Sequence, residues 1–219
     1  MQISLDLRNV SKRYSGIPAV DNVSFTARAG EVTGYLGANG SGKSTTMKMI
    51  TGLIEWNAGD ILFAGQSIRD HPIAWKKRVG YVPEEPHLYT HLSGLEYLVM
   101  VAQLRELPAS RISGTIDGLL HLLALHADRD VPISAYSKGM RQKVLLAAAL
   151  MHNPDLVLLD EPFFRARRWL LTYTSQSYSG TFCPREGGPV QFARIGDRGA
   201  YLFTCRHPPS RPHSSQRFD

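Results

Sequence analysis

Hydrophobic and polar residues alternate through the first third of the chain, which is the spacing of strands that bury one face. Leu5, Leu7 and Val10 show this alternation at the start, and further short runs follow between turns that contain glycine or proline. The pattern predicts strands near residues 5–10, 20–27, 32–36, 61–64 and 78–82, with one helix at 44–51. This part of the chain is therefore predicted to be mostly sheet.

Beyond Pro83 the apolar spacing changes to the 3.6-residue period of helices. Ser93 and Glu96 have the spacing of a capping box, which marks a helix start. The pattern predicts one helix from this box to about 107, one that includes 119–125, and one that Ser137 caps and that ends near 151. Four consecutive apolar residues, 156–159, then predict a strand covered on both faces. Together these elements predict an α/β fold: a mostly parallel sheet with an inserted helical block.

Residues 37–44, GANGSGKS, match the phosphate-loop pattern G-x-x-x-x-G-K-[ST] between a predicted strand and a predicted helix. Glycines let successive backbone amides turn toward phosphate oxygens, and the start of the helix adds positive potential. Lys43 is predicted to contact the β- and γ-phosphates, and the Ser44 hydroxyl to bind Mg²⁺. The alternative is a glycine-rich turn without chemical meaning, which the complete match and its flanks disfavour.

The buried strand at 156–159 ends in Asp160 and Glu161. A carboxylate at such a position needs a partner because burying a free charge is costly. We therefore interpret Asp160 as a Mg²⁺ ligand and Glu161 as the general base for an attacking water. The alternative is an acidic strand end that faces solvent.

Charge is distributed unevenly along the chain. Residues 1–163 hold 16 basic and 16 acidic side chains, whereas residues 164–219 hold nine arginines and three acidic residues and supply the whole net charge of +6. The high pI therefore describes one segment and does not indicate a nucleic-acid partner. Cys183 and Cys205 lie in the same segment and are interpreted as incidental thiols.

Residues 1–163 resemble the nucleotide-binding subunit of ABC transporters. Four motifs stand in that family's order: the phosphate loop, Glu84 after Tyr-Val-Pro where the family usually has Gln, YSKGMRQK at 136–143 in place of the LSGGQ signature, and LVLLDEP. The resemblance implies a P-loop NTPase core sheet with an N-terminal antiparallel part and an inserted helical subdomain at about 86–150, and it implies ATP and Mg²⁺ as cofactors.

The resemblance also assigns roles residue by residue. Tyr14 stands where the family stacks adenine, although a half-buried tyrosine at a strand end would look the same. Ser137 could be an ordinary helix cap as well as a ligand. The implied catalytic base is Glu161. The remaining implied sets are Gly37, Ala38, Asn39, Gly40, Ser41, Gly42, Lys43, Ser44 and Thr45 for the nucleotide, Ser44, Glu84 and Asp160 for the metal, and Ser137, Lys138, Gly139 and Met140 for a partner's ATP.

Two such subunits are expected to pair head to tail, as a homodimer or with another ATPase subunit. The first 163 residues contain no apolar run that could span a bilayer, and the N-terminus does not resemble a signal peptide. The resemblance therefore implies separate membrane permease chains, docked near Glu84 and residues 92–125, and a peripheral place on the cytoplasmic face of the cell membrane. The SKGM and PEE variants resemble the branch that serves ABC-2-type exporters.

Other interpretations remain open at this point. A non-transport member of the superfamily could act on ribosomes or DNA, and a remnant could bind nucleotide without turnover. A P-loop kinase or GTPase does not explain YSKGM before LVLLDE.

Residues 164–219 depart from the family pattern, which continues after DEPF with Ser-Gly-Leu-Asp and later has a switch histidine. Reading the codons of residues 164–168 from their second base permits Ser-Gly-Leu-Asp, and the same shift at 191–194 permits Ser-Ser-His-Glu. Pro189 and the glycines beside it also suit a central strand poorly. We predict that residues 164–219 are an out-of-frame, poorly ordered tail that leaves the C-terminal part of the fold incomplete.

Overall fold

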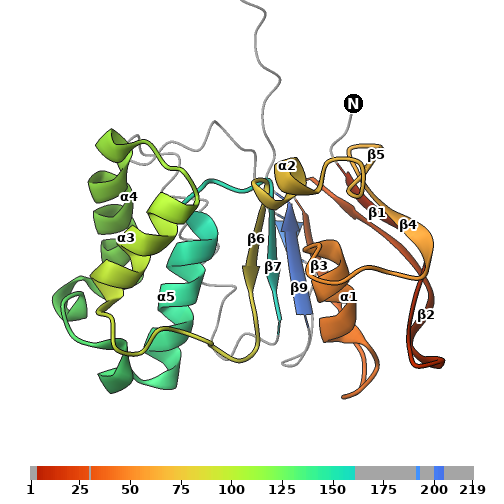
Figure 1. Ribbon diagram of the computed structural model, residues 1–219, viewed down its shortest axis with the longest axis horizontal. Helices are drawn as coiled ribbons and strands as arrows, with labels where there is room; N and C mark the ends of the chain where they lie inside the picture. The colour runs from red at the N-terminus through yellow and green to blue at the C-terminus, as the bar shows by residue number, and fades with distance from the viewer. Residues whose placement is uncertain (1–3, 30, 161–190, 193–199, 205–219) are drawn as a thin grey trace, which may run out of the picture.

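The computed structural model describes residues 4–29, 31–160, 191–192 and 200–204. In this part of the chain an antiparallel sheet, a central sheet and a helical block stand side by side (Figure 1). The architecture is α/β, as the alternation of strand and helix patterns predicts.

The antiparallel sheet is formed by the N-terminal strands and has the order β2-β1-β4-β5. The alternating residues Leu5, Leu7 and Val10 are buried, and they pack in one core with helix α1. The bounds of the strands are Ser4–Tyr14 for β1, Ile17–Arg28 for β2, Ala58–Phe63 for β4 and Gln66–Ser67 for β5.

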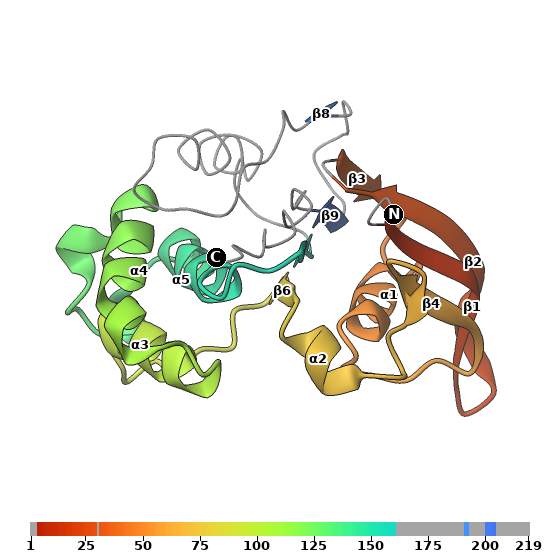
Figure 2. The same cartoon turned by 90° about the horizontal axis from the view of Figure 1, so that it is seen from above.

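The central sheet has the order β6-β7-β9-β3-β8. Strand β7 is apolar along its whole length because both of its faces are buried. Leu156 and Leu158 pack with α1, whereas Val157 and Leu159 pack with the helical block. Figure 2 shows β6 and β7 between α1 on one side and α5 on the other. The strands are β3, Glu31–Tyr35; β6, Val79–Val82; β7, Leu156–Leu159; β8, Gln191–Phe192; and β9, Ala200–Thr204.

Helix α1 (Lys43–Ile50) lies between the two sheets and has Met47, Met49 and Ile50 fully buried. A short helix, α2 (Pro72–Lys76), closes this core. Its Trp75 packs against Phe63 and donates from Nε1 to the Ile50 carbonyl oxygen at 2.6 Å. The core thus holds α1, and with it the loop that precedes α1, against both sheets.

The helical block consists of α3 (Gly94–Leu104), α4 (Ala109–Leu122) and α5 (Lys138–Leu150), with 3₁₀ turns at His126–Asp128 and Ile133–Ala135. The predicted capping box is present: Ser93 Oγ accepts from the Glu96 amide and the Glu96 carboxylate accepts from the Ser93 amide. Helix α3 ends before the predicted residue 107 because Glu106 takes a left-handed φ of 57°.

The position between β3 and β7 differs from the arrangement that the family resemblance suggests. There the family's strand corresponds to residues 187–192, but Gln191–Phe192 pairs with the outer side of β3, and β9 fills the central position antiparallel to both neighbours. Pro189 lacks the amide that a central ladder needs. Residues 161–190, 193–199 and 205–219 lie outside the described residues, so the poorly ordered tail stays a prediction for them.

Candidate functional site

Three loops leave the central sheet at one edge. Strands β3 and β7 both run antiparallel to β9, so they are parallel to each other, and β6 is parallel to β7. Tyr35 pairs with Ala200 and Leu159 with Tyr201, which places the carboxyl ends of β3 and β7 at the same level. The phosphate loop, the segment after Val82 and Asp160 therefore meet at the edge where ligands of α/β sheets bind.

Two glycines shape the phosphate loop. Gly40 and Gly42 have φ values of 80° and 86°, a region that side chains rarely adopt. At Gly42 space is limiting too, because a Cβ atom would lie 2.3 Å from the Ala19 carbonyl oxygen. No side chain caps α1 within the described part of the chain, in contrast to α3 and α5. The start of α1 is therefore a place where backbone amides can donate to an anionic ligand.

Lys43 is the cation of this loop. Its side chain is only 6% exposed, and Nζ donates to the carbonyl oxygens of Gly37 at 2.9 Å and Ala38 at 3.0 Å. These contacts bring the ammonium group back over the loop. Phosphate oxygens that enter the loop would meet a positive charge already held in place.

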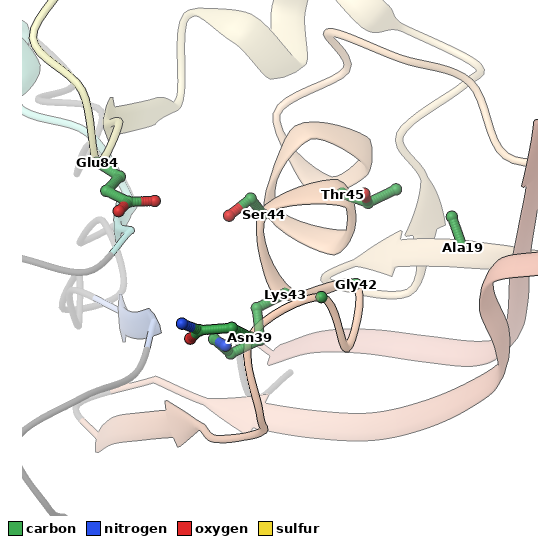
Figure 3. Close-up of a pocket in the computed structure, with 8 residues that line it drawn as sticks. Ala19, Asn39, Gly42, Lys43, Ser44, Thr45 and Glu84 are labelled. Atoms are coloured by element: carbon green, nitrogen blue, oxygen red, sulfur yellow. The ribbon is translucent and has the colours of Figure 1, made fainter.

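A pocket of about 310 Å³ opens beside the loop. Across it, the Ser44 hydroxyl and the Glu84 carboxylate point toward one another (Figure 3). Gly37, Ala38 and Ser41 belong to the loop but not to the lining. The lining residues are Ala19, Asn39, Gly40, Gly42, Lys43, Ser44, Thr45 and Glu84. The sequence does not predict Ala19 as a lining residue, because its position beside the pocket depends on how β2 packs against the loop.

Asp160 is 2% exposed, and the two oxygen atoms of its carboxylate have different surroundings. Oδ2 accepts from the Tyr81 hydroxyl at 3.3 Å, whereas Oδ1 is buried without a hydrogen-bond partner among the described residues. Burial and the Asp160 carboxylate raise the pKa of Tyr81 above its usual range, so the hydroxyl stays protonated and donates. An unpaired buried oxygen of this kind can accept from a water molecule or bind a cation.

These residues fit Mg²⁺. Within the described ranges no three His, Cys, Asp or Glu side chains form a ready-made metal cluster. Mg²⁺ does not need one, because it commonly takes one or two protein carboxylates, waters and the phosphates of a substrate. Asp160 Oδ1 and the Ser44 hydroxyl are ligand atoms of the required type. Glu161 lies outside the described residues.

Other predicted site residues do not line the pocket. Tyr14 is 49% exposed, and Lys12 Nζ lies 5.1 Å from its ring centre. Ser137 Oγ accepts from the Met140 amide at 3.2 Å and caps α5, as the cap prediction states. Ser137 and Lys138 are exposed, while Gly139 and Met140 are half-buried. The structure therefore does not join these residues to the phosphate loop of the same chain.

Among the described helices, none has the length and apolar character needed to cross a membrane.

Comparisons with known proteins agree on one family. The family model for ABC transporters matches residues 20–164. The ABC transporter ATP-binding protein YhcH of Bacillus subtilis is 40% identical over 162 residues, which are 74% of this chain and 52% of that protein. The Nod factor export ATP-binding protein I of Ralstonia nicotianae is 35% identical over 72% of this chain and 49% of its own length. The chain thus spans about half the length of these relatives.

A solved structure described as the ATP binding subunit of an ABC transporter is 29% identical in sequence and superposes with a TM-score of 0.68. The superposition covers 80% of this chain and 75% of that one. The likeness extends from sequence motifs to the arrangement of the sheets and helices.

Proposed function

The chain belongs to the ABC transporter family of ATP-binding proteins, and from that premise we propose that it binds Mg·ATP and couples ATP binding and hydrolysis to membrane transport. The observation that carries the proposal is the shared edge of β3, β6 and β7. It gathers a glycine-shaped loop with a buried lysine and a buried carboxylate whose Oδ1 has no partner among the described residues.

The residues of the edge have distinct roles in this proposal. Lys43 and the backbone amides at the start of α1 hold the terminal phosphates. Ser44, Glu84 and Asp160 hold the metal, and Ser44 and Glu84 face one another across the pocket (Figure 3). Mg²⁺, when bound, offsets the charge that develops on the phosphates. Glu161, which follows Asp160 in sequence, is proposed to orient and deprotonate the attacking water.

A second subunit completes the site in this proposal. The residues of the signature, 137–140, do not line the pocket of their own chain and include two exposed side chains, which leaves them accessible to another copy. We propose a head-to-tail pair, homodimeric or with another ATPase subunit, in which Ser137 and Gly139 contact the partner's ATP. Tyr14 is exposed and is proposed to stack on adenine.

Transport requires partners that cross the membrane. We propose separate permease chains that contact the region near Glu84 and residues 92–125, which places this protein at the cytoplasmic face without direct insertion. Export is the proposed direction, because the SKGM and PEE variants resemble exporter subunits and one relative is a Nod factor export protein. Nucleic acid is not a proposed partner.

We propose that this chain binds ATP but hydrolyses it more slowly than an intact relative does. The family's Ser-Gly-Leu-Asp loop and switch histidine do not occur after Phe163, and residues 164–168 and 191–194 permit both in a shifted reading frame. Hydrolysis by the purified chain, compared with an intact relative at the same ATP occupancy, measures this difference. Equal rates would refute it.

Calorimetric titration of Mg·ATP into the wild type and Lys43→Ala tests the proposed function. We expect Lys43→Ala to weaken binding at least about tenfold, because a charge-assisted contact to phosphate is lost. Lys48→Ala is the matched control, since Lys48 is an exposed lysine of the same helix outside the pocket. Unchanged affinity in Lys43→Ala, or an equal loss in both variants, would contradict the proposal.

A further inference from the structure

Glu84 places a carboxylate in the lining of the pocket, at a position where the family usually has a neutral glutamine. It is exposed, follows β6, and lines the same pocket as Lys43 and Ser44. Figure 3 shows its carboxylate directed toward the Ser44 hydroxyl, across the space that the terminal phosphates would enter. Glu85, the next residue, is also exposed but does not line the pocket.

A carboxylate and an amide behave differently at this position. A glutamine has a neutral oxygen for a cation and an NH₂ group that can donate to phosphate, so it tolerates nucleotide with or without metal. An ionised glutamate only accepts and carries a full negative charge. It repels a bare triphosphate and attracts one whose charge is partly offset by a divalent cation.

The second acidic group acts in the same direction. Asp160 lies at the end of β7, next to β6, and its Oδ1 has no hydrogen-bond partner among the described residues. Without a cation, the carboxylates of Glu84 and Asp160 therefore repel the phosphates. Lys43 Nζ, the nearby positive charge, already donates to two loop carbonyl oxygens. With a cation, both carboxylates can contribute to its binding.

We propose that Glu84 is a specificity-determining residue that selects metal-bound nucleotide and rejects metal-free nucleotide. The proposal rests on the function proposed above, because it concerns the same pocket. Its consequence is that free ATP or free ADP does not compete effectively for the site. Charges a few ångströms apart in a partly solvated pocket change affinity by about tenfold, and this is the selectivity that we assign to Glu84.

The experiment compares ATP affinity in excess Mg²⁺ with ATP affinity in excess EDTA, at one pH and one ionic strength, for the wild type, Glu84→Gln and Glu85→Gln. Both variants remove one negative charge from adjacent exposed positions. We expect Glu84→Gln to bind metal-free ATP about tenfold more tightly and Mg·ATP no more tightly, so that the ratio of the two affinities falls about tenfold. Glu85→Gln should keep the wild-type ratio.

The outcomes separate the two proposals. If Glu84→Gln keeps the wild-type ratio, or if Glu85→Gln lowers it equally, the role of Glu84 is refuted while nucleotide binding stands. If the wild type binds ATP in neither condition, the proposed function itself fails. Thermal unfolding of each variant verifies that the proteins compared are folded.

Discussion

The Tyr81 hydroxyl donates to Asp160 Oδ2 at 3.3 Å, while the other oxygen of the same carboxylate, Oδ1, has no partner among the described residues. Strands β6 and β7 are parallel neighbours, so this contact crosses between the two strands that end at the phosphate-binding edge. One oxygen is held by a hydroxyl that stays protonated, and the other is left for a cation. We therefore propose that Tyr81 is a positioning residue for the proposed metal site.

Replacing this hydroxyl tests that role. Tyr81→Phe should weaken Mg·ATP binding by about 2- to 10-fold, because this hydrogen bond is long at 3.3 Å and is worth about 0.5–1.5 kcal/mol, and it should leave metal-free ATP binding unchanged. Calorimetry with Mg²⁺ and with EDTA measures both affinities. Tyr97→Phe, in the core of the helical block, is the control for removing the hydroxyl of another largely buried tyrosine. A similar loss in both conditions would assign Tyr81 a general structural role instead.

Alanine substitutions at two glycines of the phosphate loop distinguish the cost of backbone strain from the cost of steric crowding. Gly40→Ala should lower the free energy of unfolding by about 1–2 kcal/mol, since alanine is strained at positive φ but no atom of the described residues lies within 4 Å of the added Cβ. Gly42→Ala should cost about 1–3 kcal/mol more because its Cβ meets the Ala19 carbonyl. Urea unfolding compares the two. Equal costs would show that the loop relaxes away from β2.

Alanine substitutions at two helix-capping serines distinguish an effect on helix stability from an effect on subunit pairing. Ser93 and Ser137 each accept a backbone amide at 3.2 Å at a helix start. Ser93→Ala and Ser137→Ala should therefore each lower stability by about 1 kcal/mol. Only Ser137→Ala should also reduce pairing driven by Mg·ATP, as measured by sedimentation. If Ser93→Ala reduced pairing as much, the signature would have no special part in it.

His152 predicts a pH dependence of stability. Burial, and then the charge of Arg105, lower the pKa of His152 from 6.5 to about 4, and its Nε2 lies 3.2 Å from the Val79 carbonyl oxygen. Between these two values the unfolded chain binds the proton and the folded chain does not. Stability is therefore complete above pH 6.5 and falls by about 1–3 kcal/mol as the pH drops toward 4.

His152→Gln replaces the imidazole N–H by an amide N–H donor that cannot titrate, so the unfolding free energy of the variant should fall less steeply in this range. His87→Gln, at an exposed position, is the control. Urea unfolding from pH 7 to 4 measures the differences. Parallel curves for His152→Gln and the wild type would show that carboxylates, not His152, cause the acid sensitivity.

The elements that could be predicted from sequence are those whose cause is local. The capping box at Ser93 and the apolar run of β7 were predicted with nearly their final bounds, because cap spacing and two-sided burial leave direct traces in the sequence. Helix α2 was missed, since five residues are too few to show a period. The end of α3 was misplaced because nothing in the sequence marks Glu106 as left-handed.

The site divides in the same way. The phosphate loop and Asp160 were identified from motifs, whereas Ala19 and Tyr81 were not. Ala19 matters through the approach of its carbonyl to Gly42, which depends on tertiary packing. Tyr81 left a usable signal, because a hydroxyl in one buried parallel strand beside a strand that ends in Asp160 is a natural hydrogen-bond donor. The central place of β9 depends on long-range pairing, which local patterns do not encode.

The pairing of β9 also has a consequence for biosynthesis. In the described sheet β3 and β7 do not hydrogen-bond to each other, and β9 pairs with both. The strand that sets the spacing between the phosphate loop and Asp160 is therefore translated after both of them. A nascent chain can form the N-terminal sheet and the helices while it is still being made. The spacing between the carboxyl ends of β3 and β7 is therefore fixed only after Ala200–Thr204 has been synthesised.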